Sequence, residues 1–220
     1  MAQRRVLLIV VTLIAALGAW PAGASAASPY EVEVTTQSPQ LRYFGSFSYD
    51  TAVVNGPNPR IASLLTRKVR AFTMPWADYY RNPDAKTVKY LKKAQPAYFE
   101  TSVIPTPDCK VNYVCVSQGS SFSTPLIAGS ITDIHARAWS TRTGKAAKLK
   151  DFVAPDELNA FTQRVKREIR TADCYYGFEI DLPAKYSSFP HWVPLESGIG
   201  VWFPEYEFGC QVMELRVPWK

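Results

Sequence analysis

The chain has 220 residues, of which 47% are hydrophobic and 20% are charged. This composition excludes an intrinsically disordered chain, and the length fits one ordinary globular domain. The formal net charge is +6, from 25 basic and 19 acidic residues. The basic residues are scattered along the chain, which argues against a nucleic-acid-binding groove.

Residues 1–26 have the pattern of a signal peptide. Arg4 and Arg5 precede an apolar stretch that is short for a membrane-spanning helix, and Ala24-Ser25-Ala26 forms a small-x-small cleavage site. A twin-arginine export route and an uncleaved N-terminal anchor are the alternatives. We therefore expect a secreted protein whose mature chain begins at Ala27. Without Arg4 and Arg5 that chain keeps 23 basic and 19 acidic residues, a net charge of +4.

The first elements in chain order are two strands, predicted at residues 30–34 and 41–49 from alternation and aromatic content. The turn-forming residues 55–59 follow, and apolar side chains then recur at helical spacing as far as Phe72. Asn58 suits the N-cap of this helix, with Pro59 at its first position. Pro75 should end the helix before a short turn.

The middle of the chain predicts three strands, at residues 97–104, 111–118 and 132–140. Residues 119–125 are mostly small and polar, so we expect a loop between the second and the third of these strands. The third strand alternates, with Ile134 and Ala136 on one face and Asp133 and His135 on the other.

The last part of the chain predicts a helix and a closing pair of strands. The helix starts near residue 154, and its apolar stripe consists of Leu158, Phe161, Val165 and Ile169. A short strand is expected at residues 178–182 and a proline-broken loop at residues 183–194. The closing strands are predicted at residues 201–208 and 212–217, with Met213, Leu215 and Val217 facing the core.

Strands that follow one another without crossover helices favour an antiparallel sheet. The predicted fold class is therefore α+β, with an antiparallel β-sheet packed by two α-helices on one face. Because no repeat or linker divides the chain, we expect residues 27–220 to form a single domain.

The mature region contains four cysteines, an even number that favours two disulfides in an exported protein. Four cysteines allow three pairings. Cys109 and Cys115 are close enough in sequence to close a small loop, and Cys174 with Cys210 would then tie a helix end to the closing strands. A zinc site is the alternative, but it lacks the usual Cys-x-x-Cys spacing.

No residue pattern predicts an enzyme or a cofactor. Asp133 and His135 share a strand face, but no Gly-x-Ser-x-Gly nucleophile motif accompanies them. Glu205 and Glu207 also share a face and would be the carboxylates of a wall-active hydrolase, which is the alternative function. The main interpretation is a non-enzymatic binding protein, and we expect it to be a monomer.

One aromatic segment is a candidate binding loop. Tyr186, Phe189, His191 and Trp192 lie within ten residues of one another and could stack on sugar rings or fill a groove of a protein partner. The alternative is that the same loop folds over the sheet, because large aromatic side chains usually serve packing first.

From Arg137 onward the chain resembles a known family. The segments that carry the resemblance are Ala138 to Lys145 with Leu149-Lys150-Asp151-Phe152, and Gly198 to Glu207 with Val212 to Pro218. They resemble the RsiV-like domain, the extracellular part of a lysozyme-sensing anti-sigma factor that is also found in mycobacterial secreted immunogenic antigens. The resemblance covers roughly the last 85 residues. It implies a sheet packed by two helices and a binding function without catalysis.

In the lysozyme-sensing member a Pro-x-Tyr contacts lysozyme, and Pro204 and Tyr206 match that pattern here. This chain departs from the family at Ser123-Thr124-Pro125 and has no cytoplasmic segment to hold a sigma factor. Animal lysozymes are basic, and a mature chain of net charge +4 would repel them at long range. We therefore predict weak or no lysozyme binding. The expected ligand is an anionic wall or membrane component or a host protein.

Overall fold

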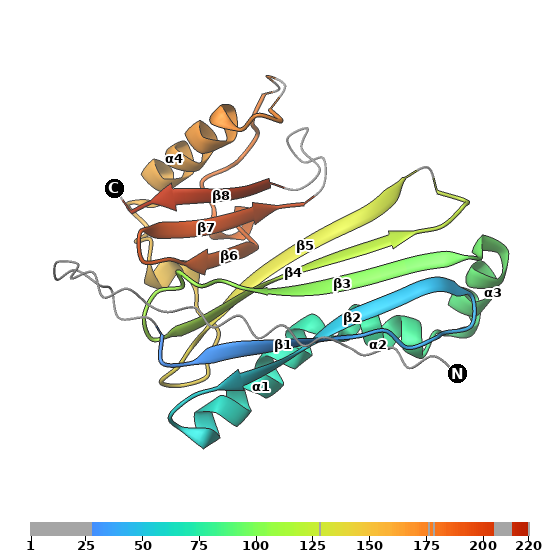
Figure 1. The fold of residues 1–220 in the computed structure, drawn as a ribbon. Helices are drawn as coiled ribbons and strands as arrows, with labels where there is room; N and C mark the ends of the chain where they lie inside the picture. Colours follow the sequence, from blue (N-terminus) through green and yellow to red (C-terminus); the bar gives the residue numbers. More distant parts are fainter. Residues whose placement is uncertain (1–27, 128, 176, 178, 205–212, 220) are drawn as a thin grey trace, which may run out of the picture.

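The computed structural model describes residues 28–127, 129–175, 177, 179–204 and 213–219. Two β-sheets and four α-helices make up the fold of these residues (Figure 1). The large sheet has the strand order β1-β2-β3-β4-β5. Its strands are β1 (Glu31–Gln37), β2 (Phe44–Asn55), β3 (Ala97–Pro105), β4 (Tyr113–Ser123) and β5 (Ser130–Ser140).

Three helices lie along one side of the large sheet (Figure 1). They are α1 (Pro59–Thr73), α2 (Pro75–Arg81) and α3 (Ala85–Ala94). The small sheet lies beside β5 and is packed by α4 (Leu158–Thr171) on its outer side. Its strands are β6 (His191–Pro194), β7 (Gly198–Phe203) and β8 (Met213–Pro218). Two 3₁₀ turns, Leu149–Asp151 and Tyr186–Ser188, flank α4 in sequence.

The α+β class predicted from the sequence is confirmed, and the structure refines its details. The described residues form two sheets where one was expected and four α-helices where two were expected. Strands β2 and β3 pair in parallel, whereas the other pairs are antiparallel. The parallel pair follows from the connection, because α1, α2 and α3 carry the chain back to the edge from which β2 started.

Local chemistry explains the helices. The Asn58 side chain accepts hydrogen bonds from the backbone N–H groups of Arg60 (3.1 Å) and Ile61 (3.3 Å), as its predicted N-cap role requires. Helix α3 was not predicted, although Asp84 caps it by accepting from the Thr87 N–H at 2.7 Å. The predicted stripe of α4 is buried, and β8 alternates between buried and exposed residues as expected.

Three sequence predictions are corrected. Residues 119–123 belong to β4 and not to a loop, because they pair with β3 on one side and β5 on the other. Residues 179–182 are not a strand; this segment is irregular, and its Ile180 and Leu182 are buried in the core cluster of α4. The expected loop at 183–194 contains β6, which pairs with β7.

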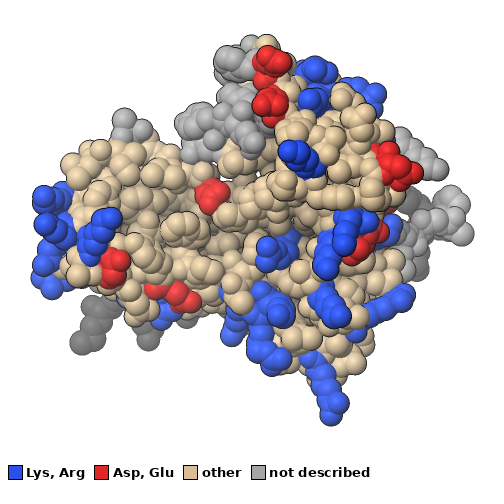
Figure 2. All heavy atoms as spheres, turned by 180° about the vertical axis from the view of Figure 1, so that it is seen from behind, with Lys and Arg blue, Asp and Glu red and all other residues tan. Residues whose placement is uncertain are grey.

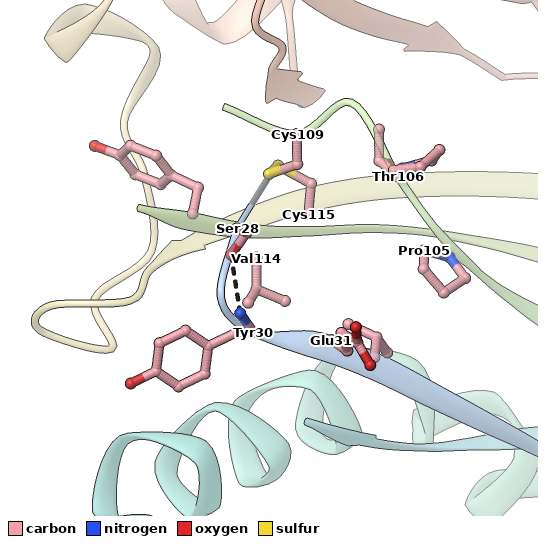
Figure 3. Close-up of a pocket in the computed structure, with 11 residues that line it drawn as sticks. Ser28, Tyr30, Glu31, Pro105, Thr106, Cys109, Val114 and Cys115 are labelled. Carbon is pink, nitrogen blue, oxygen red and sulfur yellow. Dashed lines mark hydrogen bonds between the residues drawn. A yellow bond between two sulfur atoms is a disulfide. The ribbon is translucent and has the colours of Figure 1, made fainter. Parts of the chain in front are cut away.

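The predicted disulfide Cys109–Cys115 is confirmed, with the two Cα atoms 5.7 Å apart. It lies in an apolar cluster between the two sheets, together with Val193, Leu195 and Trp202. A hollow of ≈ 410 Å³ adjoins it, lined in part by Tyr30, Glu31 and Pro105 (Figure 3). Cys174 is not a free thiol, and its predicted partner Cys210 lies outside the described residues.

One further prediction concerns a segment that the structure does not describe. The signal peptide, residues 1–26, lies outside the described residues and remains a prediction. Within the described ranges, none of the helices has the length and hydropathy needed to span a membrane.

Candidate functional site

Most of the predicted aromatic loop serves packing. Phe189 is 2% exposed and Trp192 is 9% exposed, and both lie in the core between α4 and the small sheet. Tyr186 is half-buried, and its hydroxyl donates a hydrogen bond to the Val153 carbonyl at 2.7 Å. These side chains hold the segment against the core, so a ligand would reach Phe189 and Trp192 only after they were uncovered.

His191 is the member of this loop that lies beside other titratable groups. Its ring is 4.5 Å from the ring of His135, whose Nε2 lies 2.7 Å from Asp133 Oδ2. Burial, together with His135 and Arg137, lowers the pKa of His191 to about 4, while Asp133 acts in the opposite direction. His191 is therefore neutral near pH 7 and cannot pair with an anion there.

Pro204 borders a groove on the helix side of the large sheet. The groove has a volume of ≈ 650 Å³. Its lining combines rings from α2 and the sheet with polar groups of β4 and β5, including Trp76, Tyr80, Phe122, Ser120, Ser121 and Asp133. Tyr206, Glu205 and Glu207, which were predicted to lie beside Pro204, are outside the described residues.

The rings of the groove form one continuous set of contacts. Tyr80 stacks on Phe122 with ring centroids 5.1 Å apart and planes inclined by 4°. It also contacts Phe99 at 4.7 Å and stacks on Trp76 at 6.4 Å. Burial, together with Tyr79 and Tyr90, raises the pKa of Tyr80 to about 12, so its hydroxyl stays protonated. The groove floor is therefore fixed by packing and uncharged.

A second hollow of ≈ 330 Å³ extends the groove past Tyr80 and Phe122, which line both. Tyr79 and Tyr90 form its walls, and they are 42% and 39% exposed. Trp76, at the other side of Tyr80, is also 42% exposed. Trp76, Tyr79 and Tyr90 thus offer accessible ring surface along two adjoining hollows, which is unusual for a surface whose rings serve only packing.

Sequence reasoning did not identify these residues as a site. Trp76, Tyr79 and Tyr80 lie within a segment that was expected to be a turn, and the neighbouring helix α3 was not predicted. The available signal was the density of aromatic residues between Trp76 and Tyr90, which includes four rings in fifteen residues. That density does not distinguish a buried cluster from an accessible groove.

The described residues do not assemble a recognisable catalytic centre. None of them forms a group of three or more His, Cys, Asp or Glu side chains suited to a metal ion. Asp133 and His135 are in contact, as the sequence pattern allowed, but in the described part of the chain no serine or threonine hydroxyl is hydrogen-bonded to His135. The arrangement lacks the activated nucleophile that acyl transfer requires.

Comparison with known proteins finds similar folds among solved structures. No protein-family model matches the chain, and no curated protein matches it. A crystal structure of a DUF3298 family protein from Pseudomonas aeruginosa PAO1 is similar over 90% of this chain and 93% of that one, with a TM-score of 0.55 and 14% identity. A member from Bacteroides fragilis is similar over 89% and 91%, with a TM-score of 0.53 and 11% identity.

The chain has a DUF3298-like fold. The DUF3298 family includes the RsiV-like domain, so the structural similarity agrees with the resemblance seen in the sequence at the level of the fold. At these identities the similarity supports the architecture and assigns no ligand.

Proposed function

We propose that this protein is a secreted, non-enzymatic binding protein of the bacterial cell envelope or extracellular space, and that it binds a wall glycan in the aromatic groove. The observation that carries the proposal is the contacting set of Trp76, Tyr79 and Tyr80, with Tyr90 in the adjoining hollow; Trp76, Tyr79 and Tyr90 are each about 40% exposed. The predicted signal peptide supports the location.

The chemistry of the lining favours a sugar chain over other ligands. Each sugar ring has a face of C–H groups that packs on an aromatic ring, while its hydroxyl groups need hydrogen-bonding partners at the edge. Ser120, Ser121 and the carboxylate of Asp133 supply such groups beside the rings. Because the two hollows share Tyr80 and Phe122, the groove is extended, and this shape suits several linked sugar rings.

Isothermal titration of the secreted form (residues 27–220) with soluble peptidoglycan fragments tests this function. We expect Trp76→Ala to weaken binding by about tenfold, which corresponds to the loss of one stacking contact of about 1.4 kcal/mol. Tyr98→Ala is the matched control, because Tyr98 is 45% exposed but alternates with Phe99 and therefore lies on the opposite face of β3.

Equal losses of affinity in Trp76→Ala and Tyr98→Ala, or no binding of fragments by the unmodified chain, would contradict the glycan proposal.

Binding of a host protein such as lysozyme is a separate outcome. We expect it to be weak, because both proteins are basic. A submicromolar lysozyme complex lost in Tyr206→Ala would contradict that expectation.

A hydrolase remains the second candidate because of one observation, the contact of His135 with Asp133 at the rim of the groove. We expect no turnover of peptidoglycan or simple esters, since a nucleophile is missing from the described part of this site. Turnover that disappears in His135→Ala or Glu205→Gln would favour the hydrolase.

A further inference from the structure

Another hollow, distinct from the aromatic groove and from the hollow that extends it, is strongly basic. It has a volume of ≈ 600 Å³ and lies between α1, β5 and the turn that follows β5. Its charged lining residues in the described structure are Lys68, Arg137, Lys145 and Lys148, and none of its lining residues is acidic. Figure 2 shows Lys and Arg side chains gathered on the side of the molecule where α1 lies.

The backbone turn that carries Lys145 packs against α1. Gly144 has a φ of +66°, and a Cβ at this position would lie 2.3 Å from Cδ2 of Leu64, so the turn rests directly on α1. The turn is closed by hydrogen bonds from Gly144 N to Ser140 O (2.8 Å) and from Ser140 N to Lys145 O (2.9 Å). The turn that carries Lys145 is therefore held against α1, and Lys145 lines the hollow together with Lys68 of α1.

The floor of the hollow is aromatic and rigid. Phe72 and Trp139 are in edge-to-face contact at 5.6 Å, and Trp139 is 3% exposed. The Arg137 guanidinium lies over the Phe72 ring, 5.3 Å from its centroid, which fixes the side chain at the edge of the hollow. An anion in this hollow would meet a fixed guanidinium and three lysine ammonium groups.

Among the described residues, none forms an ion pair that would neutralise one of these four cations. In the part of the chain that the structure describes, no salt bridge involves Lys68, Arg137, Lys145 or Lys148. The closest candidate on β5, Asp133, contacts His135 instead. Four uncompensated positive charges around one concave surface produce a positive potential that attracts anions.

We propose that this basic hollow binds the phosphate groups of a linear, phosphate-bearing polymer of the bacterial wall. Lysine ammonium groups bind phosphate as point charges, and a row of them matches a polymer with repeated single charges. A wall polymer fits better than a bilayer surface, because none of the exposed large hydrophobic side chains of the described residues lines this hollow to insert into lipid.

The hollow and the aromatic groove lie along the same strand. Asp133 lines the groove and Arg137 lines the hollow, with His135 between them on the same face of β5. Four residues of a strand span about 13 Å. A wall polymer that contains both sugar and phosphate could therefore contact both sites, although the phosphate site stands on its own observations.

The test uses sodium tripolyphosphate as the probe, titrated into the secreted form at low salt. The double variant Lys68→Gln/Lys145→Gln should bind it at least about tenfold more weakly. The control Lys92→Gln/Lys93→Gln removes the same net charge from exposed positions on α3 and should change binding by less than about twofold. Equal losses in the two double variants, or no binding by the unmodified chain, would overturn the proposal.

Two further binding measurements distinguish a phosphate-bearing wall polymer from a membrane surface and from the ligand of the aromatic groove. Any binding to vesicles that contain phosphatidylglycerol should come from exposed lysines elsewhere, such as those of α3, and not from the basic hollow. The Lys68→Gln/Lys145→Gln variant should therefore bind these vesicles as strongly as the unmodified chain does. Vesicle binding that depends on Lys68 and Lys145 without tripolyphosphate binding would overturn the proposal in favour of a membrane. Peptidoglycan-fragment binding by the same variant should be unchanged, which distinguishes failure of this site from failure of the groove.

Discussion

At the scale of single residues, His191 shows how burial changes the chemistry of a side chain. Burial and the neighbouring His135 and Arg137 lower the pKa of His191 from 6.5 to about 4, whereas Asp133 opposes the shift. In the unfolded chain His191 would take up a proton with its ordinary pKa of 6.5. Between pH 6.5 and pH 4 the unfolded state therefore binds more protons at this residue than the folded state does.

This difference predicts that the stability contributed by a neutral His191 is present above pH 6.5 and is lost as the pH falls towards 4. The loss should be roughly 2 to 3 kcal/mol for this residue, since each pKa unit corresponds to 1.36 kcal/mol. Denaturant unfolding at pH 7.0 and pH 4.5 measures it. The drop between the two values should be smaller in His191→Gln, which cannot titrate; an unchanged drop would contradict the assignment.

The feature that was hardest to predict from the sequence was which individual side chains are accessible for binding. Trp192 and Trp76 look alike in the chain, because both lie among aromatic and proline residues. The structure covers Trp192 with the packing around α4 and leaves Trp76 42% exposed in a groove. Which of the two tryptophans is accessible depends on contacts between segments that are distant in sequence. The periodicity of apolar residues gives no information about those contacts. Pro204 was a candidate by resemblance, and it is among the residues that line the groove.

At the scale of elements, the strongly patterned segments were predicted and those set by their neighbours were not. Helices α1 and α4 carry clear apolar stripes, and α1 has its Asn58 cap. The second half of β4 contains Gly119, Ser120 and Ser121, which have low strand propensity, yet it pairs on both sides. The parallel β2–β3 pair could not be predicted without knowing that three helices form the crossover.

One element-scale prediction concerns the junction of α1 with the sheet. Gln118 of β4 is 1% exposed, and its Nε2 donates a 2.6 Å hydrogen bond to the carbonyl of Thr73, the last residue of α1. Helix C-terminal carbonyls lack helical partners, so Gln118→Leu would leave a buried acceptor unpaired. We expect a loss of about 1–3 kcal/mol in the free energy of unfolding.

Gln95→Leu is the control for this prediction, because Gln95 makes the equivalent bond to the Lys92 carbonyl near the end of α3 at an exposed position. Water can replace the lost donor there, so denaturant unfolding should detect a change within about 0.5 kcal/mol. Similar losses in the two variants would mean that burial of the Thr73 carbonyl is not what makes Gln118 important.

At the scale of the whole molecule, two sheets with separate cores are joined by a third cluster. The α4 side of the small sheet and the α1 side of the large sheet bury different residues. Between them, Ile134 and Ala138 of β5 meet Leu195 and Trp202, beside the Cys109–Cys115 disulfide. Backbone hydrogen bonds from Lys110 N to Pro194 O (2.9 Å) and from Glu196 N to Asp108 O (3.0 Å) add to this junction.

This junction predicts that the two sheets unfold as one cooperative unit. Trp202 is 3% exposed, and Trp202→Ala should remove about 3–5 kcal/mol because it empties the cluster that both sheets share. Phe161→Ala is the matched control, since Phe161 is 1% exposed but packs within the α4 cluster.

Amide hydrogen exchange in sub-denaturing guanidinium then measures the opening free energy of each sheet. In the unmodified chain and in Phe161→Ala, the amides of β4 and of β7 should share one opening free energy. In Trp202→Ala the β7 amides should open at a lower free energy than those of β4. Separate opening of the sheets in the unmodified chain would contradict this coupling.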